Sequence, residues 1–353
     1  MFPYYLLIFV PLFFSVVRFK TKSKIVYNRL PLIMFFIFFI ILLSLRSVNC
    51  GVDLMNYQNK FDNISYSSLK SFFDFSSVEQ GYKFLSAISK IIVNDFQFFL
   101  FLCAIVSVVP IMLLYINETK HNLLTISLFV GVAPFTIFFS GLRQSIAIGI
   151  GIICYYFCKK NKIILFLLFV ALAFSFHQSS IVLLLLYPLT HVKFTKKWIA
   201  PILILFVVFM VYNKQIFSVL MGLNDRYESL YTISDTGSYT YLILIFIFVI
   251  YSFVIPDEND GDLIGLRNLL VLMLFIQSFA PINTVVMRLN YYFLILIPII
   301  IPKIIDNSKP QYRQVANISS IVFTCFFIFW FFKEAYTGSN ILHAFPYIPF
   351  WED

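Results

Sequence analysis

Arginines at the ends of apolar stretches are the residues of this sequence most suited to chemistry. The chain has eight arginines, and four of them fall on one predicted side of the apolar stretches: Arg46, Arg143, Arg226 and Arg288. An arginine at membrane depth costs about 2.5–3.5 kcal/mol on insertion scales, so its presence needs an explanation. A guanidinium grips phosphate or carboxylate through two parallel hydrogen bonds, which predicts an anion site. The alternative is that these side chains reach lipid head groups or pair with nearby acids.

Arg143 is the best single candidate because of where it lies. It belongs to the segment Ser140-Gly141-Leu142-Arg143-Gln144, between the end of one apolar stretch and the start of the next. The free N–H groups at the start of a helix attract anions, so they and the guanidinium can face the same ligand. Gln144 is expected to bind the substrate beside it.

His177 is the next candidate. It lies in Phe174-Ser175-Phe176-His177-Gln178-Ser179-Ser180, a polar break between two apolar stretches, and is predicted to reach the same side as Arg143. Imidazoles titrate near neutral pH, which suits proton transfer. A lone histidine is also common as a structural residue, and this alternative stays open.

Further polar residues accompany the other arginines. Arg288 opens the apolar stretch that contains Tyr291, much as Arg143 opens its own. Candidate substrate-binding residues are Arg46, Asp53, Tyr57, Glu79, Arg226, Tyr227 and Tyr291. Aromatic rings beside an arginine can line a sugar site. For Arg46 and Asp53 a simple surface ion pair is the alternative, and for the tyrosines a belt at the membrane interface.

Several kinds of chemistry lack their usual motifs. The sequence has no Walker A loop, no Gly-x-Gly-x-x-Gly and no His-Glu-x-x-His. The chain holds four histidines, mostly isolated, so a zinc site is not expected. Asp260-Gly261-Asp262 resembles the acidic pair of nucleotide-sugar transferases but stands in a short acidic turn, where we interpret it as chance. We predict no metal and no cofactor.

The elements that position these residues must cross a membrane. Of the 353 residues 60% are hydrophobic and 12% charged, and the mean hydropathy is +0.89, whereas soluble domains carry about 25% charged residues. The net charge of +9 comes largely from lysines in short loops between apolar stretches. That pattern indicates membrane topology rather than nucleic-acid binding. We predict an all-α polytopic integral membrane protein, folded as a single transmembrane domain over residues 1–353.

Placing the basic loops in the cytoplasm gives about twelve crossings. They are expected at about 2–17, 30–45, 96–115, 123–139, 145–158, 163–176, 179–190, 198–213, 239–255, 263–280, 289–302 and 315–332. Both termini are then outside. The stretch 163–190 could also be one long tilted helix, because 14 residues reach only about 21 Å of a core about 30 Å thick.

Three outer segments are long: a first loop over 46–95, a second over 214–238 and a tail over 333–353. In the first loop, Gly81 to Val93 is amphipathic and predicts a helix lying in the membrane interface. Its apolar face contains Phe84, Leu85, Ile88, Ile91 and Ile92.

Taken together, these residues resemble a known family. The pattern is Arg46…Asp53…Tyr57, Glu79-Gln80-Gly81-Tyr82, Gly141-Leu142-Arg143-Gln144-Ser145-Ile146-Ala147, Phe176-His177-Gln178-Ser179-Ser180 and Met287-Arg288-Leu289-Asn290-Tyr291-Tyr292. It is similar to the polytopic polysaccharide polymerases, the O-antigen polymerase (Wzy) and EpsG-like family, over about residues 46–300.

The resemblance implies a GT-C-like membrane glycosyltransferase in a bacterial inner membrane, with both termini periplasmic. It would join oligosaccharide repeat units carried on undecaprenyl pyrophosphate, on the periplasmic face, with undecaprenyl pyrophosphate leaving. Arg143 and Arg288 would hold the pyrophosphate, and His177 would be either a further donor to it or the base for the attacking hydroxyl. Membrane lipids, a chain-length regulator and a flippase would be its partners.

Other classes stay open. A flippase or transporter of the same lipid-linked sugar also needs outer cations, but should spread its charges through the membrane depth and show repeat symmetry between halves. A membrane O-acyltransferase should place its key residues toward the cytoplasm. An O-antigen ligase shares nearly all of the chemistry.

Overall fold

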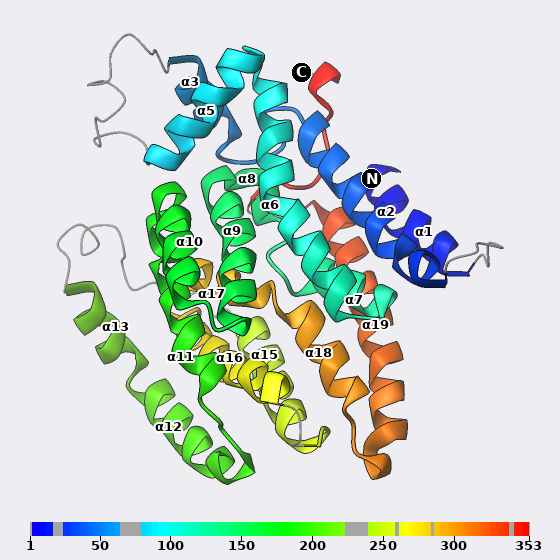
Figure 1. Ribbon diagram of the computed structural model, residues 1–353, viewed down its shortest axis with the longest axis vertical. Coiled ribbons are helices and arrows are strands. Elements are labelled where there is room, and N and C mark those ends of the chain that lie inside the picture. Colours follow the sequence, from blue (N-terminus) through cyan, green and yellow to red (C-terminus); the bar gives the residue numbers. More distant parts are fainter. Residues whose placement is uncertain are drawn as a thin grey trace. The chain divides into compact units, whose positions relative to one another are not determined.

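The computed structural model describes residues 2–16, 24–63, 79–222, 239–257, 261–283, 286–338 and 342–352. Over these ranges the chain is helical and contains no strand, only two isolated β-bridges. It divides into two compact units, a first unit of Met1–Leu184 with Ile321–Asp353, and a second of Leu185–Ser320. The ribbon in Figure 1 shows the helices of both. The predicted all-α class is confirmed.

The first unit contains α1 (Phe2–Val16), α2 (Lys24–Leu45), α3 (Leu54–Asn63), α5 (Gln80–Ile92), α6 (Phe96–Glu118), α7 (Asn122–Gly131), α8 (Ile137–Ser140), α9 (Leu142–Lys159), α10 (Ile163–Phe176), most of the 3-10 helix η1 (Gln178–Leu185), the end of α19 (Arg313–Thr337) and η5 (Phe350–Glu352). The second contains α11 (Leu186–His191), η2 (Lys196–Trp198), α12 (Ile199–Val211), α13 (Asn213–Gly222), α15 (Thr240–Val254), α16 (Gly261–Gln277), α17 (Met287–Leu294), α18 (Ile297–Asp306) and η4 (Pro310–Tyr312).

Several of these helices are apolar and suit a membrane. In the described ranges two stretches are long and apolar enough to span one, Phe96–Glu118 and Pro310–Thr337. Two bent pairs raise the number to four if each counts as one span, and further apolar helices are shorter. The chain is therefore consistent with a membrane protein, while the number of twelve crossings stays a prediction.

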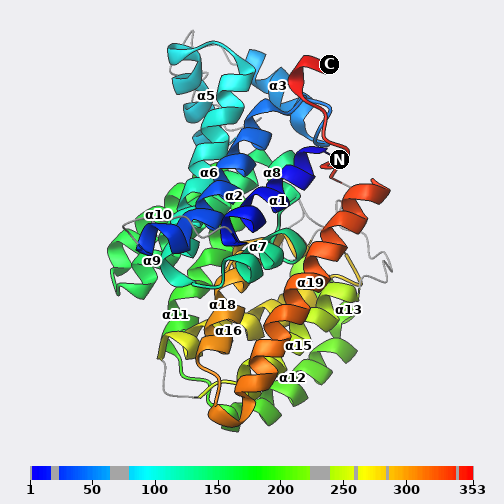
Figure 2. The same cartoon turned by 90° about the vertical axis from the view of Figure 1, so that its right-hand side faces the viewer.

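The long helix α6 begins and packs for identifiable reasons. The side chain of Asp95 caps its start by accepting a hydrogen bond from the Phe98 N–H at 2.8 Å. Its 23 residues rise about 34 Å, enough for a bilayer core of about 30 Å. Gly149 of α9 lets the two helices approach closely, because a Cβ there would lie 2.6 Å from the Ser107 carbonyl oxygen. Helices α6, α9 and α10 consequently lie side by side (Figures 1 and 2).

The stretch that the sequence left open, 163–190, is broken at His177. Helix α10 ends at Phe176, and His177 has an extended backbone with φ −154° and ψ 116°. The chain continues as the 3-10 helix η1. Residues 123–139 are also broken, into α7 and α8 around Pro134. Both breaks place polar residues at the ends of apolar helices.

Helices α3, α5 and the start of α6 share an aromatic core. The ring of Phe61 on α3 stacks on Phe99 of α6 with centroids 5.1 Å apart, and Tyr82 of α5 contacts Phe99 at 5.4 Å. Tyr57 and Tyr82 lie 5.5 Å apart. These contacts hold α3 and α5 against the N-terminal turn of α6.

The C-terminal segment, residues 342–352, packs onto the loop after α2. The Ser47 N–H donates to the Ile348 carbonyl at 2.8 Å, and the Val52 N–H donates to the Leu342 carbonyl at 3.3 Å. Near the other terminus, the Tyr4 hydroxyl donates to the Ala344 carbonyl. Both ends of the described chain therefore lie near each other in the first unit (Figure 2).

Candidate active site

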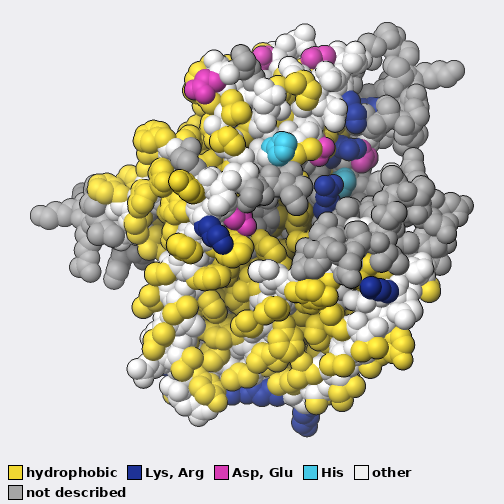
Figure 3. All heavy atoms as spheres, turned by 180° about the vertical axis from the view of Figure 1, so that it is seen from behind, with side chains coloured by type: hydrophobic (Ala, Val, Ile, Leu, Met, Phe, Trp, Pro, Cys, Tyr) yellow, Lys and Arg dark blue, Asp and Glu magenta, His cyan; other side chains and the backbone are white. Residues whose placement is uncertain are grey.

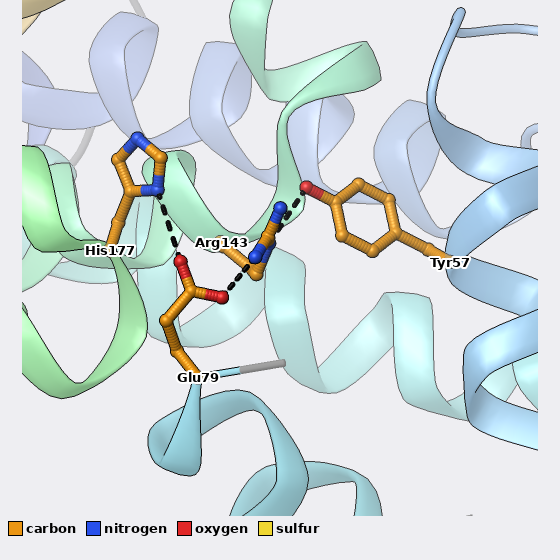
Figure 4. A network of polar contacts seen from close by, with 4 residues as sticks. All are labelled: Tyr57, Glu79, Arg143 and His177. Atoms are coloured by element: carbon orange, nitrogen blue, oxygen red, sulfur yellow. Dashed lines mark hydrogen bonds and ion pairs between the residues drawn. The ribbon is translucent and has the colours of Figure 1, made fainter. Parts of the chain in front are cut away.

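Four side chains from four separate segments of the first unit meet in one polar network (Figure 4). The Arg143 guanidinium donates through Nη1 to the carboxylate of Glu79 and through Nε to the Tyr57 hydroxyl at 3.2 Å. On the other side of the carboxylate, His177 Nδ1 lies 3.8 Å from Glu79 Oε1. Glu79 thus stands between the arginine and the histidine. The structure brings together the four residues that the sequence placed on one outer face.

Each side chain is positioned by the end of a helix or by its first turns. Arg143 lies in the first turn of α9, which begins after Gly141, and Glu79 is the residue before the first turn of α5. His177 is the residue after the last turn of α10. Tyr57 lies on α3, where its backbone N–H donates to the Asp53 carbonyl at 3.1 Å. The network therefore forms where α5 and α9 begin and α10 ends, and these helix ends carry its polar side chains.

Asp53 connects α3 to the turn before α9. Its backbone N–H donates to Ser140 Oγ at 3.3 Å, and Ser140 Oγ lies 3.4 Å from Asp53 Oδ2. Tyr82 of α5 supports α3 from another direction, because its hydroxyl donates to the Tyr57 carbonyl at 2.9 Å. Asp53, predicted to bind substrate, is thus in place to orient Tyr57 and the turn that precedes Arg143.

A close approach between α5 and α10 sets the separation of Glu79 and His177. A Cβ at Gly81 would lie 2.7 Å from the Phe176 ring and 2.8 Å from Ser175 Oγ. The absence of a side chain at Gly81 leaves room for these two side chains, so the start of α5 and the end of α10 pack closely together.

The electrostatics of the site keep the carboxylate charged. Burial raises the pKa of Glu79, but His177 and Arg143 lower it more, and together they bring it to about 2. Burial raises the pKa of the Tyr57 phenol, and the adjacent Arg143 opposes this. Glu79 is therefore an anion at any physiological pH, and Tyr57 keeps its proton.

Two nitrogen atoms of the network are available to a ligand. Within the part of the chain that the structure describes, Arg143 Nη2 and His177 Nε2 make no hydrogen bond, and both side chains are partly exposed. The second ring nitrogen of His177 points away from Glu79 (Figure 4). The site thus offers a cationic donor and an imidazole nitrogen to a polar substrate.

Arg46 lies close by in the fold but is enclosed. It is 1% exposed, donates through Nη1 to the Leu43 carbonyl, and has its guanidinium carbon 6.0 Å from the centre of the Phe139 ring. Its Nε and Nη2 atoms find no partner among the described residues. The C-terminal segment covers the backbone beside it. A contact with sugar stays a prediction for Arg46.

The remaining predicted residues lie elsewhere. Gln144 is buried in the first turn of α9. Arg288 is exposed and Tyr291 partly buried on α17, in the second unit. Arg226 and Tyr227 lie outside the described residues. That Arg143 and Arg288 share one pocket is consequently still a prediction.

Three residues that hold the site together, Gly81, Tyr82 and Ser140, are not among those predicted from the sequence to bind substrate or to act in catalysis. Their contacts join segments far apart in the chain, and no local pattern announces them. Of the three, only Gly81 has a sequence signal for its role, because a glycine inside an amphipathic helix often has a packing reason. In the described ranges no group of three His, Cys, Asp or Glu side chains is arranged to hold a metal ion.

An all-helical chain with several apolar helices, and with a partly open charged cluster at their ends, is typical of a membrane-embedded protein that acts on a polar substrate. The model of the EpsG family matches residues 29–349, nearly the whole chain, and the chain belongs to this family. EpsG-like proteins are polysaccharide polymerases related to Wzy. No curated protein and no solved structure matches the chain significantly.

Proposed function

We propose that this protein joins oligosaccharide repeat units carried on undecaprenyl pyrophosphate, at the periplasmic face of a bacterial inner membrane. The product is O-antigen or a related surface polysaccharide. The observation that carries the proposal is the network of Arg143, Glu79, Tyr57 and His177, with one guanidinium nitrogen and one imidazole nitrogen open to a ligand. The lipid-linked donor supplies a pyrophosphate and the acceptor repeat unit supplies a sugar hydroxyl, and these are the two groups that such a site suits.

Arg143 stabilises the charge that forms during transfer. As the bond between the anomeric carbon and the pyrophosphate oxygen breaks, its electron pair goes to that oxygen. A guanidinium already held in place by Glu79 and Tyr57 needs no reorganisation to receive this charge. Arg288 is the second arginine we assign to the pyrophosphate, with Tyr291 beside it.

His177 is the base in this proposal. Glu79 faces Nδ1 and favours a proton on that nitrogen, which leaves the lone pair on Nε2. Nε2 takes the proton of the acceptor hydroxyl while the hydroxyl oxygen forms the new bond to the anomeric carbon. The separation of 3.8 Å is longer than a hydrogen bond, and such contacts commonly shorten when substrate binds. Glu79 is then a positioning residue rather than a sugar ligand.

The remaining predicted residues surround the sugars or support the site. Arg46, Gln144, Arg226 and Tyr227 are assigned to the glycan, and Asp53 to the placement of Tyr57. A flippase that delivers the lipid-linked unit and a chain-length regulator are the expected partners.

Single replacements of Arg143 and His177 by Ala test the proposal in the native host, with surface glycan separated on a gel. Loss of one preorganised donor to a developing negative charge costs roughly 10²–10³-fold in rate. We expect the ladder of long glycans to disappear while the one-repeat product stays. Arg143→Lys should also fail, because an ammonium cannot reproduce the fork that Tyr57 and Glu79 hold.

Arg313→Ala is the matched control. This arginine belongs to the second unit, where it donates to the Ile305 and Asp306 carbonyls. Its ladder should be normal. An unchanged ladder in the Arg143 and His177 variants would remove the site, and loss of every product would indicate export or an earlier step instead.

A further inference from the structure

Helix α5 buries several of its polar residues and exposes three large apolar ones. Ser86 and Ser89 are 0% exposed and Lys83 is 6% exposed. On the other face, Phe84 is 58%, Ile91 81% and Ile92 59% exposed. The spacing of 84, 91 and 92 follows the helical repeat, so these side chains form one stripe. A helix that is reversed in this way is unfavourable in water and implies an apolar neighbour along the stripe.

Helix α10, which contacts α5, also carries exposed apolar side chains. Leu168 and Leu172 share one face of α10, whereas Phe174 is exposed on another face. The α5 stripe begins just over one turn after Glu79. The Gly81 contact with Phe176 fastens the two helices together at that point. Hydrophobic side chains cover much of the molecular face seen in Figure 3, while charged groups are few.

The apolar stripe of α5 thus adjoins one small charged cluster. A molecule with an anionic head and a long apolar chain has the matching chemistry, because its head can reach Arg143 while its chain lies on the adjoining stripe. A free sugar phosphate would use only the cluster, and a bulk lipid would use only the stripe. Because the charged cluster and the apolar stripe adjoin, they favour a single amphiphilic ligand that contacts both.

We propose that Phe84, Ile91 and Ile92 on α5 form the docking surface for the isoprenoid chain of the lipid-linked substrate, and that α5 guides its pyrophosphate to Arg143. This rests on the proposed function and extends it to how substrate is selected: by chain length, at a surface separate from the reacting groups.

The test compares two donors in the purified, lipid-reconstituted protein. One carries a repeat unit on undecaprenyl pyrophosphate, and the other carries the same unit on a short, water-soluble isoprenyl pyrophosphate. Phe84→Gln removes an apolar contact worth about a tenfold change in affinity. We expect KM for the long-chain donor to rise roughly tenfold, with kcat and the KM for the short-chain donor unchanged. Phe84→Leu should restore the long-chain KM.

Leu168→Gln is the matched control, because Leu168 is an equally exposed apolar residue (60%) on α10 but lies more than two turns before His177. It should change neither KM. A second measurement is independent of turnover: a photoreactive phenylalanine at position 84 should crosslink undecaprenyl pyrophosphate, and one at position 168 should not.

The outcomes separate the two proposals. Equal KM changes for both donors, no change in Phe84→Gln, or equal crosslinking at 84 and 168 would overturn the docking surface, the last because it would indicate contact with bulk lipid. Each of these leaves the role of Arg143 intact. Activity retained in Arg143→Ala would instead overturn the proposed function.

Discussion

At the scale of single residues, Glu79 links two side chains that the sequence keeps far apart. The sequence shows no acid near His177, and Glu79 is expected there only as a substrate ligand. The structure puts its carboxylate against Arg143 on one side and His177 on the other. An interaction between distant segments leaves no local trace in the sequence, which is why the type of residue was predictable and the pairing was not.

The charge of Glu79 gives a pH dependence that can be measured. Its pKa falls from the usual 4.5 to about 2, so the network contributes stability that is fully present above 4.5 and is lost as the pH falls through about 2. We expect thermal unfolding of Glu79→Gln to occur below that of the wild type by a constant margin from about pH 5 to 8. The margin should shrink below pH 4.5.

The same variant should show reduced turnover, because His177 loses its orienting partner. A stability margin that changes between about pH 5 and 8 would mean that another group, not the carboxylate of Glu79, controls the network.

At the scale of elements, the spacing between α5 and α10 depends on Gly81. The added methyl group in Gly81→Ala would lie 2.7 Å from the Phe176 ring, so that ring, next to His177, or the helix that carries it must shift. Small displacements of reacting groups cost large factors in rate, so we expect kcat to fall roughly tenfold or more. Polymerisation rate and unfolding temperature are measured together, so that loss of fold is recognised.

Gly261→Ala provides the comparison, because a Cβ at this position in α16 has no atom within 4 Å. It should keep full activity. Normal turnover in Gly81→Ala would show that the position of α5 against α10 does not matter for the reaction.

The boundaries of many helices follow from the sequence. The end of α10 at Phe176 was predicted, and α9 and α15 begin within a few residues of the expected positions, because apolar runs bounded by Lys or by polar residues leave little choice. The breaks are less evident. The bend of 47° between α17 and α18 occurs inside one apolar run, where Pro298 in the first turn of α18 is the local signal for it.

The periodicity of α5 alone does not say which of its faces is buried. The prediction of a helix in the membrane interface turns the stripe of 84, 91 and 92 outward. In the structure this stripe is exposed, and Ser86 and Ser89 are buried inside the first unit. In a soluble protein the opposite arrangement would be expected.

At the scale of the whole molecule, the sequence predicts class and family, and the family match over residues 29–349 confirms the resemblance. The first unit collects Arg143, Glu79, Tyr57 and His177, while Arg288 belongs to the second. A single pyrophosphate can be held by both arginines only if positions 143 and 288 face the same side of the membrane. That requirement is the central claim.

Cysteine labelling in intact cells tests it most directly. Arg143→Cys and Arg288→Cys are made in a chain carrying Cys325→Ser, since Cys325 is exposed and the other four cysteines are buried. Lys160→Cys, in a predicted cytoplasmic loop, serves as the control and should react only after permeabilisation. We expect a membrane-impermeant maleimide to label positions 143 and 288 from outside. Labelling of the two from opposite sides would contradict the account.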